Sequence, residues 1–495
     1  MLSARPLLVL SCIASASALA SNLTVSPQYS AVTTCARISK AISPASAVFY
    51  PDSTQYAADI AHYSEGSTQN STCSVEPGTA RDVGIILQIL GETRTPFAVK
   101  GGGHTGNQGF SSTSGVHIAM TRFSDVQNNP SHGTVDVGPG LIWDDVYKAL
   151  NGTGLGVVGG RVSGVGLAGF TLGGGYSWKT NQYGLSCDNV AAYELVLPNG
   201  TVTSVTSSSG DLWFALRGGF NNFGIVTKFT LVSHPQTDVW GGVAVFNGTQ
   251  FDALSAAVSH FDATNTDKKA QLIFTLTAPA QTTVASVILF YDGPTPSPGI
   301  FDAFLAVPTL SADLSTRSFL SLVQSAPTGT ASIGRRQTYS TVSILKYTPA
   351  VLQAVQNSTE FWSARLAAVE PDVYFTINSE PFDAALYRHA PVAASESAYP
   401  PARDAALTPL NFDVGWNDPA NDALVRATLA RATADLRAAA RRLGQAVEDD
   451  FVYGNYALEG TPVEEIYGKN VGRLRAIKGT YDPGNVMGLA GGFKV

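Results

Sequence analysis

The spacing of hydrophobic positions predicts alternating helices and strands from Thr79 onward. In 80–92 (ARDVGIILQILGE) the apolar residues recur at helical spacing, which places Val83, Ile86, Leu87 and Leu90 on one side. Short strands are expected at 95–102, 115–120 and 134–140, and a second helix at 141–152. This alternation favours an α+β or α/β domain.

The later pattern divides the chain further. Segment 190–206 predicts two strands around an Asn-Gly turn, and 211–235 predicts a short helix, a glycine-rich turn and a long strand that ends near Pro235. Beyond it, alternating strands mix with alanine-rich helices. The longest of these, 422–444, carries arginines that we interpret as a solvated face. The predicted divisions are a signal peptide (1–20), an N-terminal segment (21–69), a first domain (70–237), an inserted domain (238–449) and a C-terminal return to the first domain (450–495).

Composition indicates a large globular protein, and the N-terminal residues indicate that it is secreted. Of the 495 residues 44% are hydrophobic and 14% charged, and the net charge of −7 offers no attraction to nucleic acid or to an anionic membrane. Residues 1–20 combine Arg5, an apolar run and the small-x-small site Ala18-Leu19-Ala20, as in a signal peptide. No other stretch approaches the apolar length of a membrane span.

Glycosylation sequons and cysteines agree with a secreted protein. Six Asn-x-Ser/Thr sequons occur, at Asn22, Asn70, Asn151, Asn199, Asn247 and Asn357. Asn151, Asn199 and Asn247 lie in Asn-Gly-Thr, which also resembles a plain turn. Without Cys12 of the signal peptide, Cys35 and Cys73 are the natural disulfide pair in an oxidising compartment; two free thiols are the alternative. Cys187 is then unpaired, and we expect it to be buried and inert.

The stretch 100–109 (KGGGHTGNQG) places three glycines directly before His104. Glycine lets the backbone approach a ligand closely, and successive N–H groups in such a turn form an anion-binding concavity. A pyrophosphate could therefore lie on Gly101–Gly103, with His104 beside it. The alternative is a mobile surface loop with a solvated histidine, and the local sequence does not decide between the two.

A second glycine-rich segment, 163–175, contains the literal G-x-G-x-x-G of Gly164–Gly169. That motif alone suggests a nicotinamide site. Its context is poor, because no βαβ unit surrounds it and a helix with Gly173–Gly175 so near would be unstable. A second backbone cradle for the same extended cofactor fits better, and FAD is the natural candidate.

Five blocks together carry a family resemblance: GGGH, GLAGFTLGGGYSWKTNQYGLSCDNV, DLWFALRGGFNNFGIVTKF, YGNY and IYGKNVGRLRAIKGTYDPGNV. They resemble, in the same order, the berberine-bridge-enzyme-like oxidoreductases, which have the FAD-binding domain of the p-cresol methylhydroxylase and vanillyl alcohol oxidase type. The resemblance covers about 70–235 and 450–490. It implies an α+β fold, with a two-part FAD-binding domain and an inserted α+β substrate domain whose antiparallel sheet is covered by helices.

The resemblance also implies how the cofactor is held. His104 would be joined through its ring to the 8α-methyl group of FAD, and a neutral imidazole is a competent nucleophile. Relatives often add a second link through a cysteine, but Val162 stands at that position here, so FAD would be covalent through His104 only. Val165 matches the family position that governs oxygen access, and its small side chain indicates an oxidase that forms H2O2.

Tyr456 matches the catalytic base of the family's Y-x-N-Y motif, here Tyr453–Tyr456. A free tyrosine has a pKa near 10, so the role requires surroundings that lower this pKa. The alternative is a core aromatic residue with a satisfied hydroxyl. Metal binding is not expected, because the histidines lack ligand spacing. The predicted cofactor-binding residues are His104, Gly101, Gly102, Gly103, Thr105, Gly109, Ser163, Gly164, Val165, Gly169, Gly184, Val190, Gly224, Val226, Tyr453 and Asn455.

The function predicted from the sequence is a secreted, monomeric FAD-linked oxidase. It would take hydride from an alcohol or related C–H of a small molecule or sugar and be reoxidised by O2. Family members oxidise sugars, alkaloids, phenols and other secondary metabolites, and the residues that choose among them lie in the poorly matching inserted domain. Two other classes stay open: a secreted carbohydrate-binding protein with an inactive flavin fold, and an NAD-dependent dehydrogenase.

Overall fold

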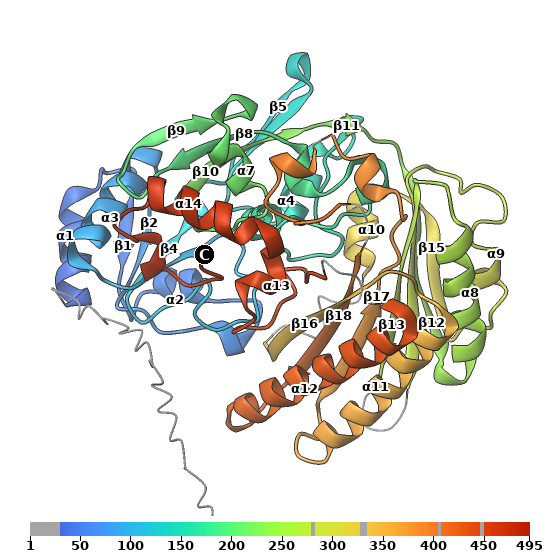
Figure 1. Ribbon diagram of the computed structural model, residues 1–495. Helices are drawn as coiled ribbons and strands as arrows, with labels where there is room; N and C mark the ends of the chain where they lie inside the picture. Colours follow the sequence, from blue (N-terminus) through green and yellow to red (C-terminus); the bar gives the residue numbers. More distant parts are fainter. Residues whose placement is uncertain (1–29, 279–282, 327–333, 392, 404–406, 446–449) are drawn as a thin grey trace, which may run out of the picture.

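The computed structural model describes residues 30–278, 283–326, 334–391, 393–403, 407–445 and 450–495 (Figure 1). The predicted signal peptide and the sequon at Asn22 lie outside these residues. In the described ranges no helix is both long and apolar enough to cross a membrane. The asparagines of the other five sequons are all exposed.

The first sheet has four strands in the order β1-β2-β4-β3: Ala47–Phe49, Cys73–Glu76, Val116–Ala119 and Phe97–Lys100. Strands β2 and β3 both pair in parallel with β4, which is possible because helix α3 (Ala80–Thr93) makes the crossover between them. Helices α1 (Ala31–Ala41) and α2 (Thr54–Ile60) precede this sheet's second strand. The predicted disulfide is present and joins Cys35 of α1 to Cys73 of β2, while Cys187 is free and buried.

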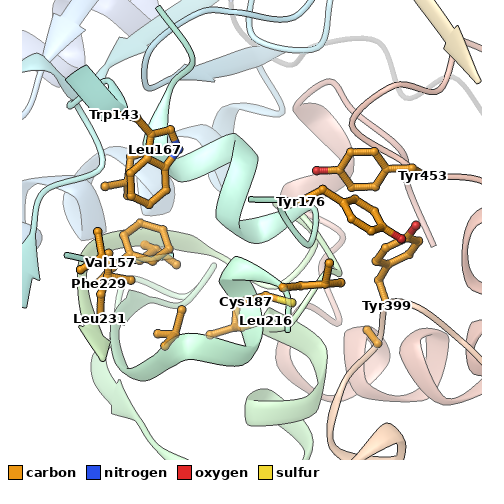
Figure 2. Packing of buried hydrophobic residues seen from close by; sticks show 14 of the residues in the cluster. Trp143, Val157, Leu167, Tyr176, Cys187, Leu216, Phe229, Leu231, Tyr399 and Tyr453 are labelled. Atoms are coloured by element: carbon orange, nitrogen blue, oxygen red, sulfur yellow. The ribbon is translucent and has the colours of Figure 1, made fainter. Parts of the chain in front are cut away.

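The second sheet is antiparallel, in the order β5-β6-β10-β8-β9: Val126–Asn129, Thr134–Val137, Ile225–Val232, Val190–Val196 and Val202–Val205. A short pair, β7 (Leu155–Gly156) and β11 (His234–Pro235), lies apart from it. The helices of this region are α4 (Trp143–Leu150), α5 (Leu167–Leu172), α6 (Thr180–Tyr183) and α7 (Asp211–Leu216). Figure 2 shows part of the core here, with Phe229 and Leu231 of β10 near Trp143 and Leu167.

The third sheet has seven antiparallel strands in the order β15-β12-β14-β13-β17-β18-β16: Ser311–Arg317, Val239–Asn247, Val284–Tyr291, Ala270–Thr277, Tyr374–Ser379, Thr408–Trp416 and Arg336–Ile344. Helices α8 (Phe251–Thr264), α11 (Pro349–Ala367) and α12 (Asp422–Ala440) cover one face (Figure 1). Two shorter helices, α9 (Asp302–Leu305) and α10 (Phe319–Ser325), flank the edge strand β15 in sequence. The predicted α+β architecture, with an antiparallel sheet covered by helices, is confirmed.

The alternation of side chains along these strands separates two environments. In β13, Leu272, Phe274 and Leu276 pack into the core beneath the helices, whereas Ile273, Thr275 and Thr277 line a cavity on the opposite face. The uncovered face of the third sheet therefore faces the rest of the molecule.

The C-terminal segment returns to the first part of the chain. Helices α13 (Val463–Tyr467) and α14 (Val471–Tyr481) lie beside the elements of the second sheet in Figure 1. Near the end, Ala490 forms an isolated parallel bridge with Phe97 of β3. The C-terminal segment and the first sheet, far apart in sequence, are therefore neighbours in the structure. The domain boundaries given above remain predictions.

Candidate active site

A cavity of about 600 Å3 lies between the uncovered face of the third sheet and the two glycine-rich segments. Most of its wall comes from the loop around His104, the segments 161–172 and 220–226, strands β13, β14, β17 and β18, and the C-terminal residues 453–456. Twelve predicted site residues line it: Gly101, Gly102, Gly103, His104, Thr105, Val165, Gly169, Gly224, Val226, Tyr453, Asn455 and Tyr456.

The two glycine cradles contact each other directly. A Cβ on Gly102 would lie 2.4 Å from the Cα of Gly166, and a Cβ on Gly166 would lie 2.8 Å from the Cα of Gly102. Only glycine permits two backbones to come this close. Gly103 follows with φ +68°, a left-handed conformation that also favours glycine. The surface interpretation of the KGGGHTGNQG loop is therefore wrong, because this loop forms a cavity wall.

His104 is partly buried, and its imidazole is uncharged at neutral pH. Burial lowers the pKa of its imidazole to about 4, and its hydrogen bond with the Gly164 backbone offsets only part of this shift. The ring stacks on Tyr63 with centroids 4.2 Å apart. Its Nδ1 atom is buried and has no hydrogen-bond partner among the described residues. One ring nitrogen is thus free to bond a group in the cavity.

Tyr456, Arg161 and Glu380 form a closed polar triad that also lines the cavity. The Nη2 of Arg161 donates to the Oη of Tyr456 over 2.8 Å and to the Oε2 of Glu380 over 2.7 Å. The Tyr456 hydroxyl donates to the other carboxylate oxygen, Oε1, over 3.1 Å. The hydroxyl proton of Tyr456 is therefore already directed at the Glu380 carboxylate.

The protonation of Tyr456 differs from what the sequence analysis requires of a base. Burial and the Glu380 carboxylate together hold the pKa of Tyr456 well above its ordinary value, and Arg161 offsets only part of this effect. Burial also raises the pKa of Glu380, against the opposing charge of Arg161. Tyr456 is consequently a neutral phenol in the described structure. Any base function there must work by passing its proton to Glu380.

A row of polar side chains crosses the sheet face that lines the cavity. Thr275 of β13, Asn378 of β17 and Asn411 of β18 are register partners. Thr275 donates to Oδ1 of Asn378 over 2.7 Å, and Nδ2 of Asn378 donates to Oδ1 of Asn411 over 2.8 Å. The Nδ2 of Asn411 is buried without a partner among the described residues. An amide N–H group left unpaired in this way is costly unless a ligand accepts from it.

Asp413 lies two residues further along β18 and also lines the cavity. Burial raises the pKa of its carboxyl to about 7, although the Tyr374 hydroxyl opposes the shift by donating to it over 3.2 Å. The sheet face thus offers both a donor at Asn411 and a titratable acceptor at Asp413. A substrate bearing several oxygen atoms could satisfy both.

Tyr453 and Asn455 line the cavity and also form hydrogen bonds with the second glycine-rich segment. The hydroxyl of Tyr453 accepts from the Gly175 N–H over 3.1 Å and from Nδ2 of Asn455 over 2.8 Å. Nδ2 of Asn455 also donates to the Phe170 carbonyl over 3.1 Å. Figure 2 shows Tyr453 beside Tyr176 and Tyr399. The C-terminal return and the second glycine segment are therefore held together.

Five predicted cofactor-binding residues do not line the cavity. Ser163 and the Gly164 N–H donate to the Asp144 carboxylate. Gly109 packs against Gly491, whose added Cβ would overlap the Gly109 carbonyl. Gly184 caps α6 at φ +78°, and Val190 is a buried residue at the start of β8. The glycine run 164–169 leads into α5, a helix of six residues, and not into the long helix of a dinucleotide-binding βαβ unit.

Sequence reasoning missed several cavity residues. Arg161 stands directly before Val162 in a glycine-rich run, so its charge was the one available signal. Glu380, Asn411 and Asp413 come from the inserted domain, where the polar positions of each strand resemble an ordinary solvated face. Thr105, which was predicted, shapes the turn by accepting from the Asn107 N–H over 3.1 Å. Within the described residues no cluster of three or more His, Cys, Asp or Glu side chains could hold a metal ion.

Comparison with known proteins gives concordant results. Two family models match: an FAD binding domain over residues 71–206 and a berberine and berberine-like domain over 452–490. An FAD-dependent monooxygenase, drtC, from Aspergillus calidoustus is 30% identical over 90% of this chain and 87% of its own length. The chain spans about half the length of several other curated relatives that it matches.

Solved structures extend the similarity to the whole fold. A variant of BBE-like 1 from Physcomitrella patens superposes with a TM-score of 0.76 at 21% identity, covering 92% of this chain and 97% of that one. A carbohydrate oxidase from Microdochium nivale gives a TM-score of 0.76 at 18% identity, covering 92% and 98%. At these identities the likeness speaks for the fold alone. Together with the family models and the full-length relative, it places the chain among the berberine-bridge-enzyme-like FAD-dependent oxidoreductases.

Proposed function

We propose that this protein is a secreted oxidase that carries FAD covalently on His104 alone and oxidises a carbon bearing a hydroxyl group. The observation that carries the proposal is the single cavity into which His104, both glycine cradles and the Tyr456–Arg161–Glu380 triad all face. These groups supply an attachment point, a backbone surface for phosphates and a proton acceptor. The predicted signal peptide and the five exposed sequons support secretion, and a monomer remains our expectation.

The residues present fit FAD. Nδ1 of His104 is a buried, unpaired nitrogen on a neutral ring, as nucleophilic attachment needs. Gly101–Gly103 would hold the pyrophosphate on backbone N–H groups. Val162 places a hydrocarbon side chain in the wall where relatives have a second attachment cysteine, so we propose a single covalent link. When bound, FAD would supply the acceptor for the substrate's hydride and the two electrons that, with two protons, convert O2 to H2O2.

The triad performs the proton transfer. As the C–H bond breaks, the substrate hydroxyl gives its proton to Oη of Tyr456, and Tyr456 gives its own proton to Oε1 of Glu380. The substrate's C–O bond becomes a carbonyl, and Glu380 becomes a neutral carboxylic acid. Release of that proton restores the carboxylate and, with the hydrogen taken as hydride, supplies the two hydrogens of H2O2. Arg161 keeps its charge throughout. Its hydrogen bonds with Tyr456 and Glu380 hold the donor and the acceptor of the relayed proton together.

The polar row on the sheet supports a substrate rich in oxygen. Asn411 offers a free N–H group, and Asp413 offers an acceptor that titrates near neutrality. A sugar or an oxygenated secondary metabolite satisfies both, whereas a hydrocarbon with one hydroxyl leaves the Asn411 amide unpaired. The name of the carbohydrate oxidase is consistent with a sugar, whereas the name of the drtC monooxygenase states no substrate.

A coupled assay tests the function. The purified protein is offered sugars, polyols, phenols and alkaloid alcohols, and O2 consumption, H2O2 and carbonyl product are measured together. We expect equal amounts of all three with at least one substrate. Label from 18O2 in the product, without H2O2, would instead favour a monooxygenase. A colourless protein would favour the carbohydrate-binding alternative, and a strict need for NAD would favour the dehydrogenase.

The rate at which the protein bonds FAD covalently should not change in mild acid. The His104 pKa of about 4 keeps the imidazole neutral at pH 5.5, whereas a histidine with its ordinary pKa would be only roughly one tenth neutral there. We expect apoprotein from riboflavin-limited cells to bond FAD at similar rates at pH 7.5 and 5.5. The rate should fall only when the pH approaches the His104 pKa. Absorbance of the acid-precipitated protein measures the rate, and a tenfold decrease between these two values would contradict the proposal.

A further inference from the structure

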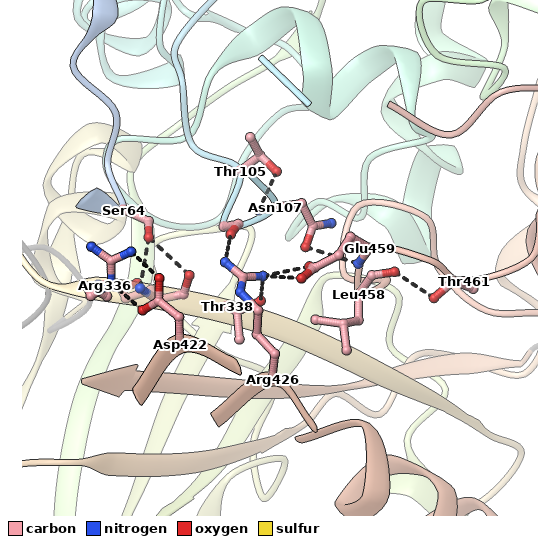
Figure 3. A network of polar contacts seen from close by, with 12 residues as sticks. Ser64, Thr105, Asn107, Arg336, Thr338, Asp422, Arg426, Leu458, Glu459 and Thr461 are labelled. Atoms are coloured by element: carbon pink, nitrogen blue, oxygen red, sulfur yellow. Dashed lines mark hydrogen bonds and ion pairs between the residues drawn. The ribbon is translucent and has the colours of Figure 1, made fainter. Parts of the chain in front are cut away.

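The loop after His104 lies against three different parts of the chain. Gly106 sits on strand β16, where an added Cβ would meet the Gln337 carbonyl oxygen at 2.7 Å and Cα of Thr338 at 2.9 Å. Helix α12 and the C-terminal return approach from the other sides, and Figure 3 shows all three meeting around Thr105 and Asn107. Gly106, two positions from His104, is therefore held by contacts with β16 and α12.

Asn107 links this loop to the segment that follows Tyr456. Its Nδ2 donates to the Ala457 carbonyl over 2.9 Å, and its Oδ1 accepts from the Glu459 N–H over 3.2 Å. The side chain is 7% exposed, so water does not compete for either bond. One buried amide thus ties a position three residues after His104 to positions one and three residues after Tyr456.

Arg426 of helix α12 makes the second link. Its Nη1 lies 2.6 Å from both carboxylate oxygens of Glu459, and its Nη2 donates to the Gly106 carbonyl over 3.0 Å. The sequence predicts a solvated arginine face on this helix, and for Arg426 that is wrong: its side chain is 15% exposed, against 70% for Arg431 on the same helix. The fork of a guanidinium suits such bridging, since it presents several donors in a fixed plane.

We infer that Asn107, Arg426 and Glu459, here called the clasp, are positioning residues that hold the loop of His104 and the segment of Tyr456 in one fixed relation. Few residues separate the clasp from either site residue, so a shift at the clasp moves His104 and Tyr456 relative to each other. Displacements of about 1 Å between reacting groups can cost roughly 100-fold in rate. The contacts of the clasp are observed in the structure. Their effect on flavin attachment and on proton transfer rests on the proposed function.

The helix offers a matched control. Arg437, also on α12, pairs with Glu465 of α13 over 2.6 Å. Its side chain is 25% exposed and that of Glu465 40%, close to the 15% and 36% of Arg426 and Glu459. Arg426→Gln and Arg437→Gln therefore remove equivalent ion pairs, and only the first contacts the loop of His104. Asn107→Asp is a second variant that keeps the side-chain size and removes the donor to Ala457.

Hydrogen–deuterium exchange tests the clasp independently of any activity. In Arg426→Gln and Asn107→Asp, we expect peptides covering 104–110 and 456–461 to exchange faster together, by at least about tenfold. In Arg437→Gln the faster exchange should be confined to α13. Faster exchange in only one of the two peptides, or in neither, or in both with Arg437→Gln, would overturn the inference.

The rates of flavin attachment and of turnover then measure the effect of the clasp on the site. Arg426→Gln and Asn107→Asp should bond FAD about 10- to 100-fold more slowly than Arg437→Gln and shift the pH profile of turnover, while the two arginine variants lose similar thermal stability. Arg426→Lys should retain the pair with Glu459 but not the full fork, and give an intermediate rate. A wild-type protein without acid-stable flavin refutes the proposed tether, and the exchange data still decide the clasp.

Discussion

Replacing His104 by alanine is expected to abolish acid-stable flavin. The wild-type protein, precipitated in acid and washed, should keep its yellow colour in the pellet, and His104→Ala should release all of it into the supernatant. The reason is that Val162 offers no thiol in the cavity, so no second bond can form. The variant should still bind FAD through the glycine cradles, but reversibly, so that dilution lowers both flavin content and the melting temperature.

His132→Ala is the appropriate control, because that histidine is exposed and lies outside the cavity wall. It should retain the acid-stable flavin in full. Colour that persists in the His104→Ala pellet would show attachment elsewhere and refute the assignment of His104. Mass spectrometry of a peptide containing residue 104, with the added mass of FAD, gives the same answer without relying on colour.

Replacing Tyr456 by phenylalanine is expected to lower turnover by about 100- to 10,000-fold, the usual worth of a positioned general base. The variant should keep its covalent flavin, because His104 lies on another segment. Phenylalanine fills the same space, and the Glu380–Arg161 pair remains intact. Stopped-flow measurement of flavin bleaching separates this defect from substrate binding. Tyr50→Phe, at an exposed position, serves as the control. Unchanged bleaching would leave Tyr456 as a packing residue only.

Glu380 should determine the acid limb of the pH profile for the same reaction. The relay needs an ionised carboxylate, and burial places the pKa of Glu380 above its ordinary value. Turnover should therefore fall as the pH is lowered through this raised pKa, because the protonated acid can no longer accept from Tyr456. In Glu380→Gln the acid limb should disappear together with most of the activity. That variant leaves the Arg161 charge buried and unpaired, so a lower melting temperature is also expected.

Much of the first half of the fold could be predicted from local pattern. The apolar spacing in 80–92 gave helix α3, and strands β3, β4, β6, β8 and β10 follow from short alternating or apolar runs between glycines. The N-terminal segment was the exception. Its helices α1 and α2 lie in a serine- and threonine-rich stretch, and their N-caps Ser30 and Ser53 were not recognised. The two serine caps and the buried face of α1, with Cys35 and Ile38, were the local signals available there.

The chain by itself determined the glycine cradles, the histidine beside them, the missing cysteine at Val162 and the family to which these belong. These features reside in contiguous residues, and glycine is required wherever backbones meet as closely as Gly102 and Gly166 do. Only the tertiary structure decided which inserted-domain residues face the cavity. Arg161 and Glu380 are 219 positions apart, and Thr275, Asn378 and Asn411 align only through strand register. The physical reason is that alternation along a strand tells the two faces apart, but not whether the polar face meets water or a binding site.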